Sequence, residues 1–469
     1  MARRKINHLL IEKLKVSDIG AEGKALGRWE NRVVFLPLAC PGDVVDVRVT
    51  RQHRNYLEGI PVHFHRYSKD RTEPVCSHFG KCGGCKWQHL SYPMQLKYKQ
   101  KQVVDQLERI GKLPLPRIRK IMASPETTYY RNKLEFTFSN NRWLTPEEME
   151  GKKEVKEKNA LGFHIPGKFD KVLDIEKCYL QPEPSNTIRL AVKQFALEKG
   201  YSFFDLKSQE GLLRNLIIRT SGIGEIMIIV VFAADDPGKR EELLHYLWSE
   251  FPALTSLYYI INRKKNDSIL DQEAIHYKGR EYIVEQMGDL KFKIGAKSFY
   301  QTNSRQAQAM YELIAEWSGL KGNEVVYDLY TGTGTIAIFL AGKARRVVGI
   351  ESVPEAIEDA WENARLNGME HVHFATGDNK DVLNPAFIDR HGQPHLVVLD
   401  PPRIGIHQRV TNTLLTLLPE RIIYVSCNPA TQARDLNLMS HRYRITRVQP
   451  IDMFPHTHHV ENVVMMERV

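Results

Sequence analysis

The C-terminal part of the chain alternates short apolar runs with longer amphipathic stretches. From Lys297 onward the apolar runs are EVVYDLY, RVVGIE, VHFATGD, HLVVLDPP, RIIYVSC, YRITRVQPIDMF and VENVVMMERV. Strands that alternate with helices in this way predict a doubly wound α/β sheet, in which a ligand lies at the carboxyl ends of the strands. We therefore expect residues 296–469 to form a Rossmann-like domain.

The preceding residues show two other patterns. Residues 8–67 alternate short β-rich runs with turns, which predicts a small OB-like barrel over residues 1–67. Residues 126–290 mix strand and helix patterns, and residues 91–111 have the start, apolar spacing and closing glycine of a helix. We expect a central mixed α+β domain over residues 68–295. Its stretch GKKEVKEKN is predicted to be an exposed hairpin tip, with an RNA contact as the alternative.

Composition narrows the class of protein. A hydrophobic content of 42% and a charged content of 26% are typical of a globular chain, and no apolar run reaches the length of a membrane span. The basic start MARRKINHLLIEKLKV returns to charged residues too early for a secretory signal. We expect a cytoplasmic monomer without membrane contact. The net charge of +10 favours an anionic partner such as RNA, with a generic soluble surface as the alternative.

Carboxylates and glycines occur where the predicted strands end. The first strand leads into a loop with Gly332 and Gly334, where glycines allow a tight turn and a close approach to a ligand. Glu351 ends the next strand, where a carboxylate can bind both hydroxyls of a ribose. Asp378 and Asp400 follow the third and fourth strands. Each acid alone is typical of a cap or a turn, but their register favours a cofactor site. The D-x-x-x-G-x-G spacing and the DPP run favour S-adenosylmethionine over a nicotinamide.

Cys427 and Glu461 are the candidate catalytic pair. Cys427 lies between a strand end and NPAT, and Glu461 opens the last strand. Uracil C5 is a poor nucleophile, but a thiolate that adds to C6 makes C5 nucleophilic, and a base can then remove the C5 proton. A buried thiol and a strand-edge acid are the plain alternatives. The polar neighbours Ser426 and Asn428 favour the catalytic interpretation, since they do not suit simple packing.

Three cysteines form a C-x5-C-x2-C cluster, and a fourth lies far along the chain. These candidate metal ligands are Cys76, Cys82, Cys85 and Cys178. Four thiolates suit zinc and an iron–sulfur cluster equally well, so the spacing does not decide between them. Cys40 stands apart and is predicted to be a small buried side chain.

Cationic and aromatic side chains near the cysteine cluster are candidate RNA contacts. They are Lys86, Trp87, Arg131 and Lys133. Such side chains suit single-stranded RNA, whose bases can be splayed out and stacked. A core position is the alternative for Trp87. A thiolate can reach C6 only from above the ring, so the target uridine is expected to leave its stack.

The motifs CSHFGKCGGCKWQHLSYPMQ, SFYQTNS, DLYTGTG, LDPPRIG, YVSCNPAT and DMFPHTHHVE closely resemble those of the RNA uracil-5 methyltransferases. Within this family, the chain is similar to the 23S ribosomal RNA enzymes that carry an N-terminal TRAM domain and an iron–sulfur cluster. The run VVFLPLACPGDVVDVRV resembles the TRAM domain itself. The resemblance implies a methyl transfer from S-adenosylmethionine to uridine C5 in 23S ribosomal RNA.

The resemblance also assigns roles to particular residues. It implies Cys427 as the nucleophile, Glu461 as the base, and a [4Fe–4S] cluster held by the four cluster cysteines. The implied cofactor contacts are Gln301, Tyr330, Glu351, Asp378 and Asp400, beside the loop glycines Gly332 and Gly334. The family loop usually has cysteine where this chain has Thr331, and some members have asparagine in place of Thr335. The first difference keeps the glycine geometry, and the second leaves Thr335 unassigned as a contact.

Two other functions fit parts of the sequence. An amino methyltransferase would share the DPP pocket but would need no covalent cysteine. A non-catalytic RNA-binding protein would use the barrel and the cysteine cluster, with the α/β domain as a vestige. The motifs do not say which uridine is modified, or whether one or two sites are used. The choice of ribosomal over transfer RNA rests on the resemblance alone.

Overall fold

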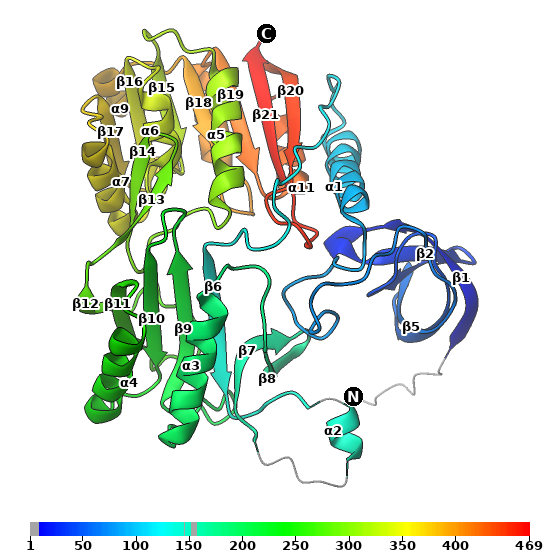
Figure 1. Ribbon diagram of the computed structural model, residues 1–469. Coiled ribbons are helices and arrows are strands. Elements are labelled where there is room, and N and C mark those ends of the chain that lie inside the picture. Colours follow the sequence, from blue (N-terminus) through cyan, green and yellow to red (C-terminus); the bar gives the residue numbers. More distant parts are fainter. Residues whose placement is uncertain (1–8, 145, 152–156) are drawn as a thin grey trace.

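A closed barrel, two seven-stranded sheets and a two-stranded hairpin organise the chain (Figure 1). The computed structural model describes residues 9–144, 146–151 and 157–469. Most of the lysine-rich stretch that was predicted to be a hairpin tip, residues 152–156, lies outside this description. In the part of the chain described, no helix is long and apolar enough to cross a membrane.

The barrel confirms the OB-like prediction for the N-terminal residues. Its strands follow the order β1-β2-β3-β5-β4. Alternate residues of β4, among them Val45, Val47 and Val49, point inward and are fully buried, as the two-residue period of a strand requires. The elements are β1 (Leu10–Ile19), η1 (Ala21–Gly23), β2 (Ala25–Trp29), β3 (Arg32–Leu36), β4 (Val44–Gln52) and β5 (Tyr56–Arg66).

The central sheet is covered on both faces. Its order is β12-β11-β10-β9-β6-β7-β8. On β10, Ile228 and Val230 pack with the helices α3 and α4, while Met227, Ile229 and Val231 pack with the C-terminal domain. Both faces are apolar for this reason, and every residue of β9 and β10 is buried. The elements are β6 (Lys133–Ser139), α2 (Pro146–Glu150), β7 (Ala160–Ile165), β8 (Lys168–Asp174), α3 (Ser185–Glu198), β9 (Leu213–Thr220), β10 (Ile226–Phe232), α4 (Pro237–Glu250), β11 (Leu254–Ile261) and β12 (Ile275–Gly279).

The C-terminal domain is the predicted doubly wound sheet, with the order β17-β16-β15-β18-β19-β21-β20. The first five strands of this order are parallel, and β21 runs antiparallel between β19 and β20. Its strands are β15 (Val325–Leu329), β16 (Arg346–Glu351), β17 (Val372–Thr376), β18 (Leu396–Leu399), β19 (Arg421–Ser426), β20 (Tyr443–Ile451) and β21 (Glu461–Arg468). The other elements are β13 (Ile283–Met287), β14 (Leu290–Ile294), α5 (Ser304–Ser318), α6 (Thr335–Ala341), α7 (Pro354–Leu366), α8 (Asn379–Val382), α9 (Pro385–His391), α10 (Gln408–Leu417) and α11 (Pro429–Met439).

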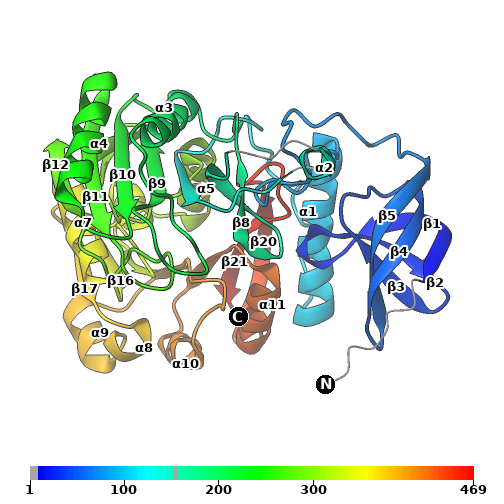
Figure 2. The ribbon, with the colours of Figure 1, turned by 90° about the horizontal axis from the view of Figure 1, so that it is seen from below.

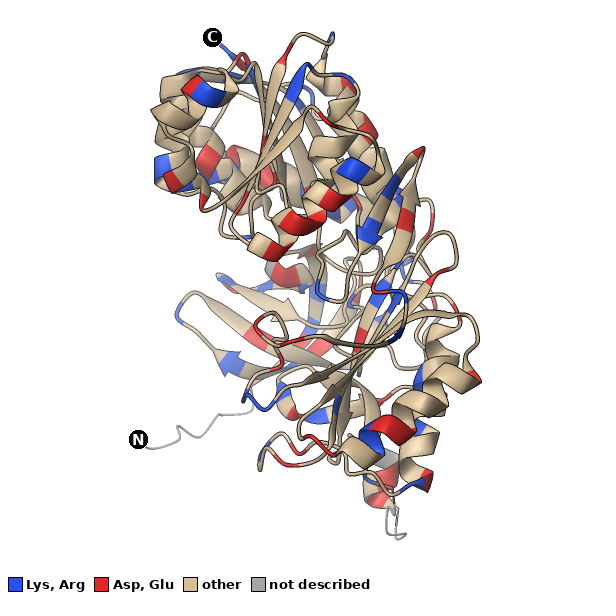
Figure 3. Ribbon diagram, turned by 90° about the vertical axis from the view of Figure 1, so that its left-hand side faces the viewer, with Lys and Arg blue, Asp and Glu red and all other residues tan. Residues whose placement is uncertain are grey.

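One helix joins the barrel to the C-terminal domain. Helix α1 (Tyr92–Gln106) continues into a π-helical turn, η2 (Leu107–Gly111), and stands between the barrel and α11 (Figures 1 and 2). Its Lys99 is fully buried and pairs with the equally buried Asp452 at 2.5 Å. Acidic and basic residues are interspersed on the outer helices (Figure 3). The net positive charge is therefore not gathered on the helices seen from that side.

Candidate active site and cysteine cavity

The strand register brings Cys427 and Glu461 together. Ser426, the last residue of β19, pairs with Asn462 on the antiparallel strand β21. Cys427 follows Ser426 and Glu461 precedes Asn462, so the thiol and the carboxyl group lie at the same end of neighbouring strands. Strand β21 pairs both with β19, which precedes Cys427, and with β20, which follows it.

Burial and neighbouring charges shift the protonation of both groups. Burial raises the pKa of Glu461 to about 8, and the nearby carboxyl group of Asp400 adds to this shift. Burial likewise raises the pKa of the Cys427 thiol to about 11, with Glu461 as the next cause. The guanidinium of Arg403 acts in the opposite direction on both pKa values. A carboxyl group, a thiol and a cation therefore share one small polar site.

The glycine loop after β15 has a left-handed backbone conformation at several residues. Tyr330, Gly332 and Gly334 all have positive φ, of 65°, 55° and 79°. A side chain at Gly334 would meet the ring of Phe374 at 2.8 Å, so glycine is required there. The amide of Gly332 donates to the Glu351 carboxylate at 3.3 Å, which ties the loop to the end of β16. The backbone N–H and C=O groups of this loop therefore lie at the carboxyl edge of the sheet.

The remaining predicted cofactor contacts lie at the same edge or beside it. Asp378 caps α8 by accepting from the Lys380 amide at 3.1 Å, and its pKa is lowered, chiefly by the Lys380 side chain. Asp400 follows β18, and burial raises its pKa to about 7. Gln301 precedes α5, and its carbonyl accepts from the Asn132 amide at 2.9 Å. Glu351, Asp378 and Asp400 end adjacent strands or follow them, as their spacing predicts.

The segment that carries Glu461 is fixed from α1. Lys99 donates to the Asp452 carboxylate at 2.5 Å and to the Phe454 carbonyl at 2.9 Å. Gln95 accepts from the His456 amide at 2.9 Å and donates to the Trp87 carbonyl at 3.0 Å. These contacts position the turn between β20 and β21, which precedes Glu461.

Sequence reasoning missed several residues of this site. Arg403 lies beside His459, 3.4 Å away, and its carbonyl accepts from Asn428 at 3.0 Å. The sequence could have pointed to Arg403, because this residue directly follows the DPP run. Asp328 is fully buried and accepts from the Thr331 hydroxyl at 2.5 Å, so Thr331 has a structural role in the loop. Lys99 gave no signal, since a lysine in a helix pattern usually lies in solvent.

The four cluster cysteines converge on one cavity of about 140 Å³. Cys76, Cys82 and Cys85 come from the loop before α1, and Cys178 comes from the segment after β8. Burial raises the pKa of Cys82 to about 12 and of Cys85 to about 11. Among the described residues, no three His, Cys, Asp or Glu side chains are grouped so that they could hold a metal ion. The four thiols thus line one cavity.

The predicted RNA contacts have different positions. Arg131 lines the cysteine cavity and lies over the Phe454 ring at 5.3 Å, and Lys86 is exposed. Lys133 is half-buried, and burial lowers its pKa. The prediction for Trp87 was wrong as a stacking surface, because its side chain is only 2% exposed and donates to the Gly23 carbonyl at 2.9 Å. It is a core residue between the barrel and α1.

Comparisons with known proteins agree with this architecture. The tRNA (Uracil-5-)-methyltransferase family matches residues 256–469, and the TRAM domain matches residues 10–62. Two relatives named as uncharacterized RNA methyltransferases are each 54% identical to this chain. The relative from Bacteroides thetaiotaomicron covers 96% of this chain and 100% of its own length, and the one from Porphyromonas gingivalis covers 97% and 99%.

A solved structure extends the similarity to the fold of the whole chain. It is the Pyrococcus abyssi tRNA (uracil-54, C5)-methyltransferase in complex with S-adenosyl-L-homocysteine. It superposes with a TM-score of 0.74 at 27% sequence identity, over 97% of this chain and 100% of its own.

Proposed function

This chain belongs to the RNA uracil-5 methyltransferases, and from that premise we propose that it methylates C5 of a specific uridine in 23S ribosomal RNA, with S-adenosylmethionine as donor. One observation carries the proposal. The register of β19 and β21 puts a thiol, Cys427, beside a carboxyl group, Glu461. These two groups are the minimum that a covalent substitution at C5 needs.

The chain's own groups account for the bond changes. Bound S-adenosylmethionine supplies the methyl group. Cys427 first loses its thiol proton to solvent. The resulting thiolate bonds to C6, and the electron pair of the C5–C6 double bond shifts to C5 and the C4 carbonyl oxygen. C5 then takes the methyl group, with S-adenosylhomocysteine as the leaving group. The ionised carboxylate of Glu461 accepts the C5 proton, the double bond re-forms, and the C6–sulfur bond breaks to return the thiolate. The pKa of Glu461, about 8, is close to neutral pH and suits this proton transfer.

We propose that the donor binds at the carboxyl edge of the sheet. The loop from Tyr330 through Gly332 to Gly334 can offer its backbone groups to the donor. Glu351 and Asp378 lie at the ends of the next two strands. Asp400 follows β18 at this edge and lies near Glu461, whose pKa it raises. Gln301 enters from the turn before α5. The methyl group would then be delivered next to Cys427.

We propose that the cysteine cavity holds a [4Fe–4S] cluster. A zinc ion would require all four sulfur atoms about 2.3 Å from one point. The four thiols line one cavity of about 140 Å³, and the resemblance of the cysteine motif to the iron–sulfur members of the family favours a multi-iron cluster there. Its positive charge would offset the burial that raises the pKa of each thiol. The cluster would join Cys178 of the central domain to the loop that supports α1.

We also propose the division of labour that the sequence predicted. Residues 1–67 would bind RNA as the TRAM barrel, residues 68–295 would hold the cluster and an RNA surface, and residues 296–469 would carry out methyl transfer. Lys86, Arg131 and Lys133 remain candidate RNA contacts. Transfer RNA is the second candidate substrate, because the similar structure that covers 97% of this chain is that of the Pyrococcus abyssi tRNA (uracil-54, C5)-methyltransferase.

Tritium release from RNA labelled at uracil C5 tests the proposal. Native protein, Cys427→Ala and a control variant Cys40→Ala would be compared on 23S ribosomal RNA and on transfer RNA transcripts. Cys40 is a suitable control because it is fully buried in a separate part of the molecule. Release from ribosomal RNA that requires Cys427 but not Cys40 supports the proposal. Release from transfer RNA alone would replace the substrate, and release by Cys427→Ala would overturn the mechanism.

A further inference from the structure

A second cavity, next to the cysteine cavity, opens between the barrel and the cysteine loop, and Phe79 lines both cavities. It has a volume of about 480 Å³. Its lining comes from the turn after β3, the segment after β5, the cysteine loop and the residues before α1: Leu38, Tyr67, Arg71, Thr72, Glu73, Pro74, Phe79, Gly80 and His89. This volume is within the usual range for a small-molecule site and accommodates one nucleotide.

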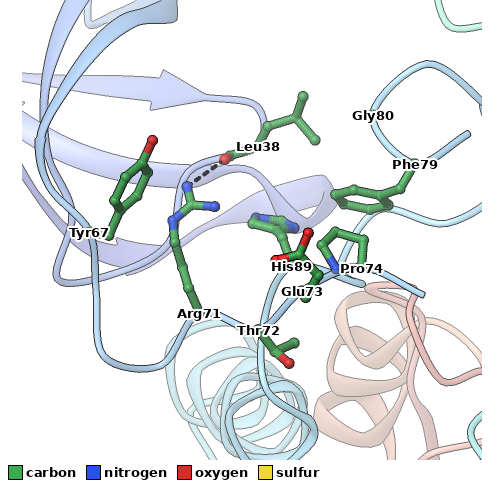
Figure 4. Close-up of a pocket in the computed structure, with 9 residues that line it drawn as sticks. All are labelled: Leu38, Tyr67, Arg71, Thr72, Glu73, Pro74, Phe79, Gly80 and His89. Atoms are coloured by element: carbon green, nitrogen blue, oxygen red, sulfur yellow. Dashed lines mark hydrogen bonds between the residues drawn. The ribbon is translucent and has the colours of Figure 1, made fainter. Parts of the chain in front are cut away.

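Aromatic side chains form two sides of this cavity. Tyr67 and Phe79 stand on opposite sides, with Arg71, Glu73 and His89 between them (Figure 4). Tyr67 is 64% exposed although it is a large aromatic residue. Its ring stacks on Phe64 at 5.0 Å, which holds it in place from behind. An exposed and fixed aromatic face is the usual platform on which an unpaired base stacks.

The charges of the cavity exclude a phosphate and favour a base. Arg71 donates to the buried Asp43 carboxylate at 2.8 Å and to the Leu38 carbonyl at 2.9 Å, so its charge is already compensated (Figure 4). His89 is buried, and burial lowers its pKa to about 4, so it is neutral at pH 7. Among the described residues, the exposed carboxylate of Glu73 has no hydrogen bond or ion pair. The cavity therefore offers an acceptor with a negative charge.

We propose that this cavity binds an unpaired guanine base of the RNA substrate. Guanine alone among the four bases presents two adjacent donors, N1–H and the N2 amino group, to the two oxygens of one carboxylate. Adenine and cytosine present an amino group beside an acceptor, and uracil presents one N–H between two carbonyl groups. Exposed Lys69 and Lys81 border the lining segments and can contact the flanking phosphates. The site would hold a guanine outside the uridine that is methylated.

The inference rests on RNA being the substrate class, but not on which RNA is methylated. Its test is a binding measurement without methyl transfer, so its failure is distinguishable from a failure of the proposed reaction. The probes are two fluorescent, unstructured RNAs of about ten nucleotides, one all adenine and one with a single internal guanine. Dissociation constants come from fluorescence anisotropy with the full-length, cluster-loaded protein. Native protein should bind the guanine probe about tenfold more tightly.

Two variants and two controls separate the roles of the ring and the carboxylate. Tyr67→Ala should weaken binding of the guanine probe about tenfold, whereas Phe169→Ala, which removes an equally exposed ring on β8, should not. Glu73→Gln should bring the ratio of the two dissociation constants close to one. Glu12→Gln makes the same charge change at an exposed residue of β1, and it should leave the ratio of the two dissociation constants unchanged.

Three results would overturn the inference. The first is a native ratio near one. The second is equal weakening by Tyr67→Ala and Phe169→Ala. The third is a Glu73→Gln protein that binds both probes more tightly by the same factor, because that result would mean that Glu73 only repels the RNA backbone.

Discussion

Five of the six thiols of the chain lie in two contrasting surroundings. Cys427 lies beside one carboxyl group and one guanidinium, whereas the four cluster cysteines face one another around a cavity. Burial raises the thiol pKa in both places. What differs is the group that can offset the cost of a buried thiolate. Thiols gathered together suit a multivalent metal cluster, but a lone thiol beside Arg403 can form a bond to a substrate and release it again.

Removing the lone thiol should have the largest effect. We expect Cys427→Ala to lower methyl transfer by about 10⁴-fold or more, because no other described group can add to C6 in its place. Single-turnover methylation of RNA with labelled donor measures this. Cys40→Ala should retain nearly full activity. Measurable turnover by Cys427→Ala, at a rate near that of native protein, would remove the distinction between the two thiol environments.

Substitution of Glu461 should separate methyl transfer to C5 from removal of the C5 proton. We expect Glu461→Gln to lower turnover by about 10²- to 10⁴-fold. Since C5 can still take the methyl group but cannot lose its proton, a covalent protein–RNA adduct should accumulate. Denaturing electrophoresis and mass spectrometry detect that adduct, and a further Cys427→Ala change should abolish it. A Glu461→Gln protein with slow turnover and no adduct would assign proton removal to another group.

Substitution of a cluster cysteine should affect iron binding and thermal stability, and should leave donor binding nearly unchanged. We expect Cys178→Ser to lose most of its bound iron and its visible absorption, and to unfold at a lower temperature, because cluster binding contributes to folding. Binding of S-adenosylmethionine, measured by calorimetry, should stay within about twofold, since that site lies on another sheet. Iron retained at the native level in Cys178→Ser would show that the fourth ligand was assigned wrongly.

Features of the two thiol sites that rest on local sequence patterns could be predicted from the sequence, whereas contacts between distant parts of the chain could not. The strand runs, Cys427, Glu461 and the cysteine spacing were all visible, since they follow chain order and local pattern. The placement of β21 between β19 and β20 was not, although it is what brings Cys427 and Glu461 together. The buried pair of Lys99 and Asp452 was hidden as well, because burial of a charge depends on a partner far away in the chain.

The pH dependence of stability gives a smaller, thermodynamic test of the active-site environment. The folded-state pKa of Glu461, about 8, lies above that of a carboxyl group in an unfolded chain. Between these values the native state holds a proton that the unfolded state has lost, so this group makes stability fall as pH rises. The slope is about 1.4 kcal/mol per pH unit. Glu461→Gln should remove this part of the slope between about pH 5 and 8, as urea unfolding at several pH values would show. An unchanged slope would contradict the raised pKa.

The smallest expected effect concerns the connection between the two thiol sites. Gln95 bonds both to the Trp87 carbonyl, just after the cysteine loop, and to the His456 amide, in the turn before Glu461. We expect Gln95→Leu to lower kcat by about tenfold or less and to leave iron content unchanged, because it loosens the turn without touching a cluster cysteine. Gln100→Leu on the same helix is the matched control, since Gln100 bonds to Arg119 and Ile121 instead. If both variants lose activity equally, α1 only stabilises the fold. If Gln95→Leu alone loses activity, the cysteine loop helps to position the catalytic base, and the two thiol sites act on the same turn.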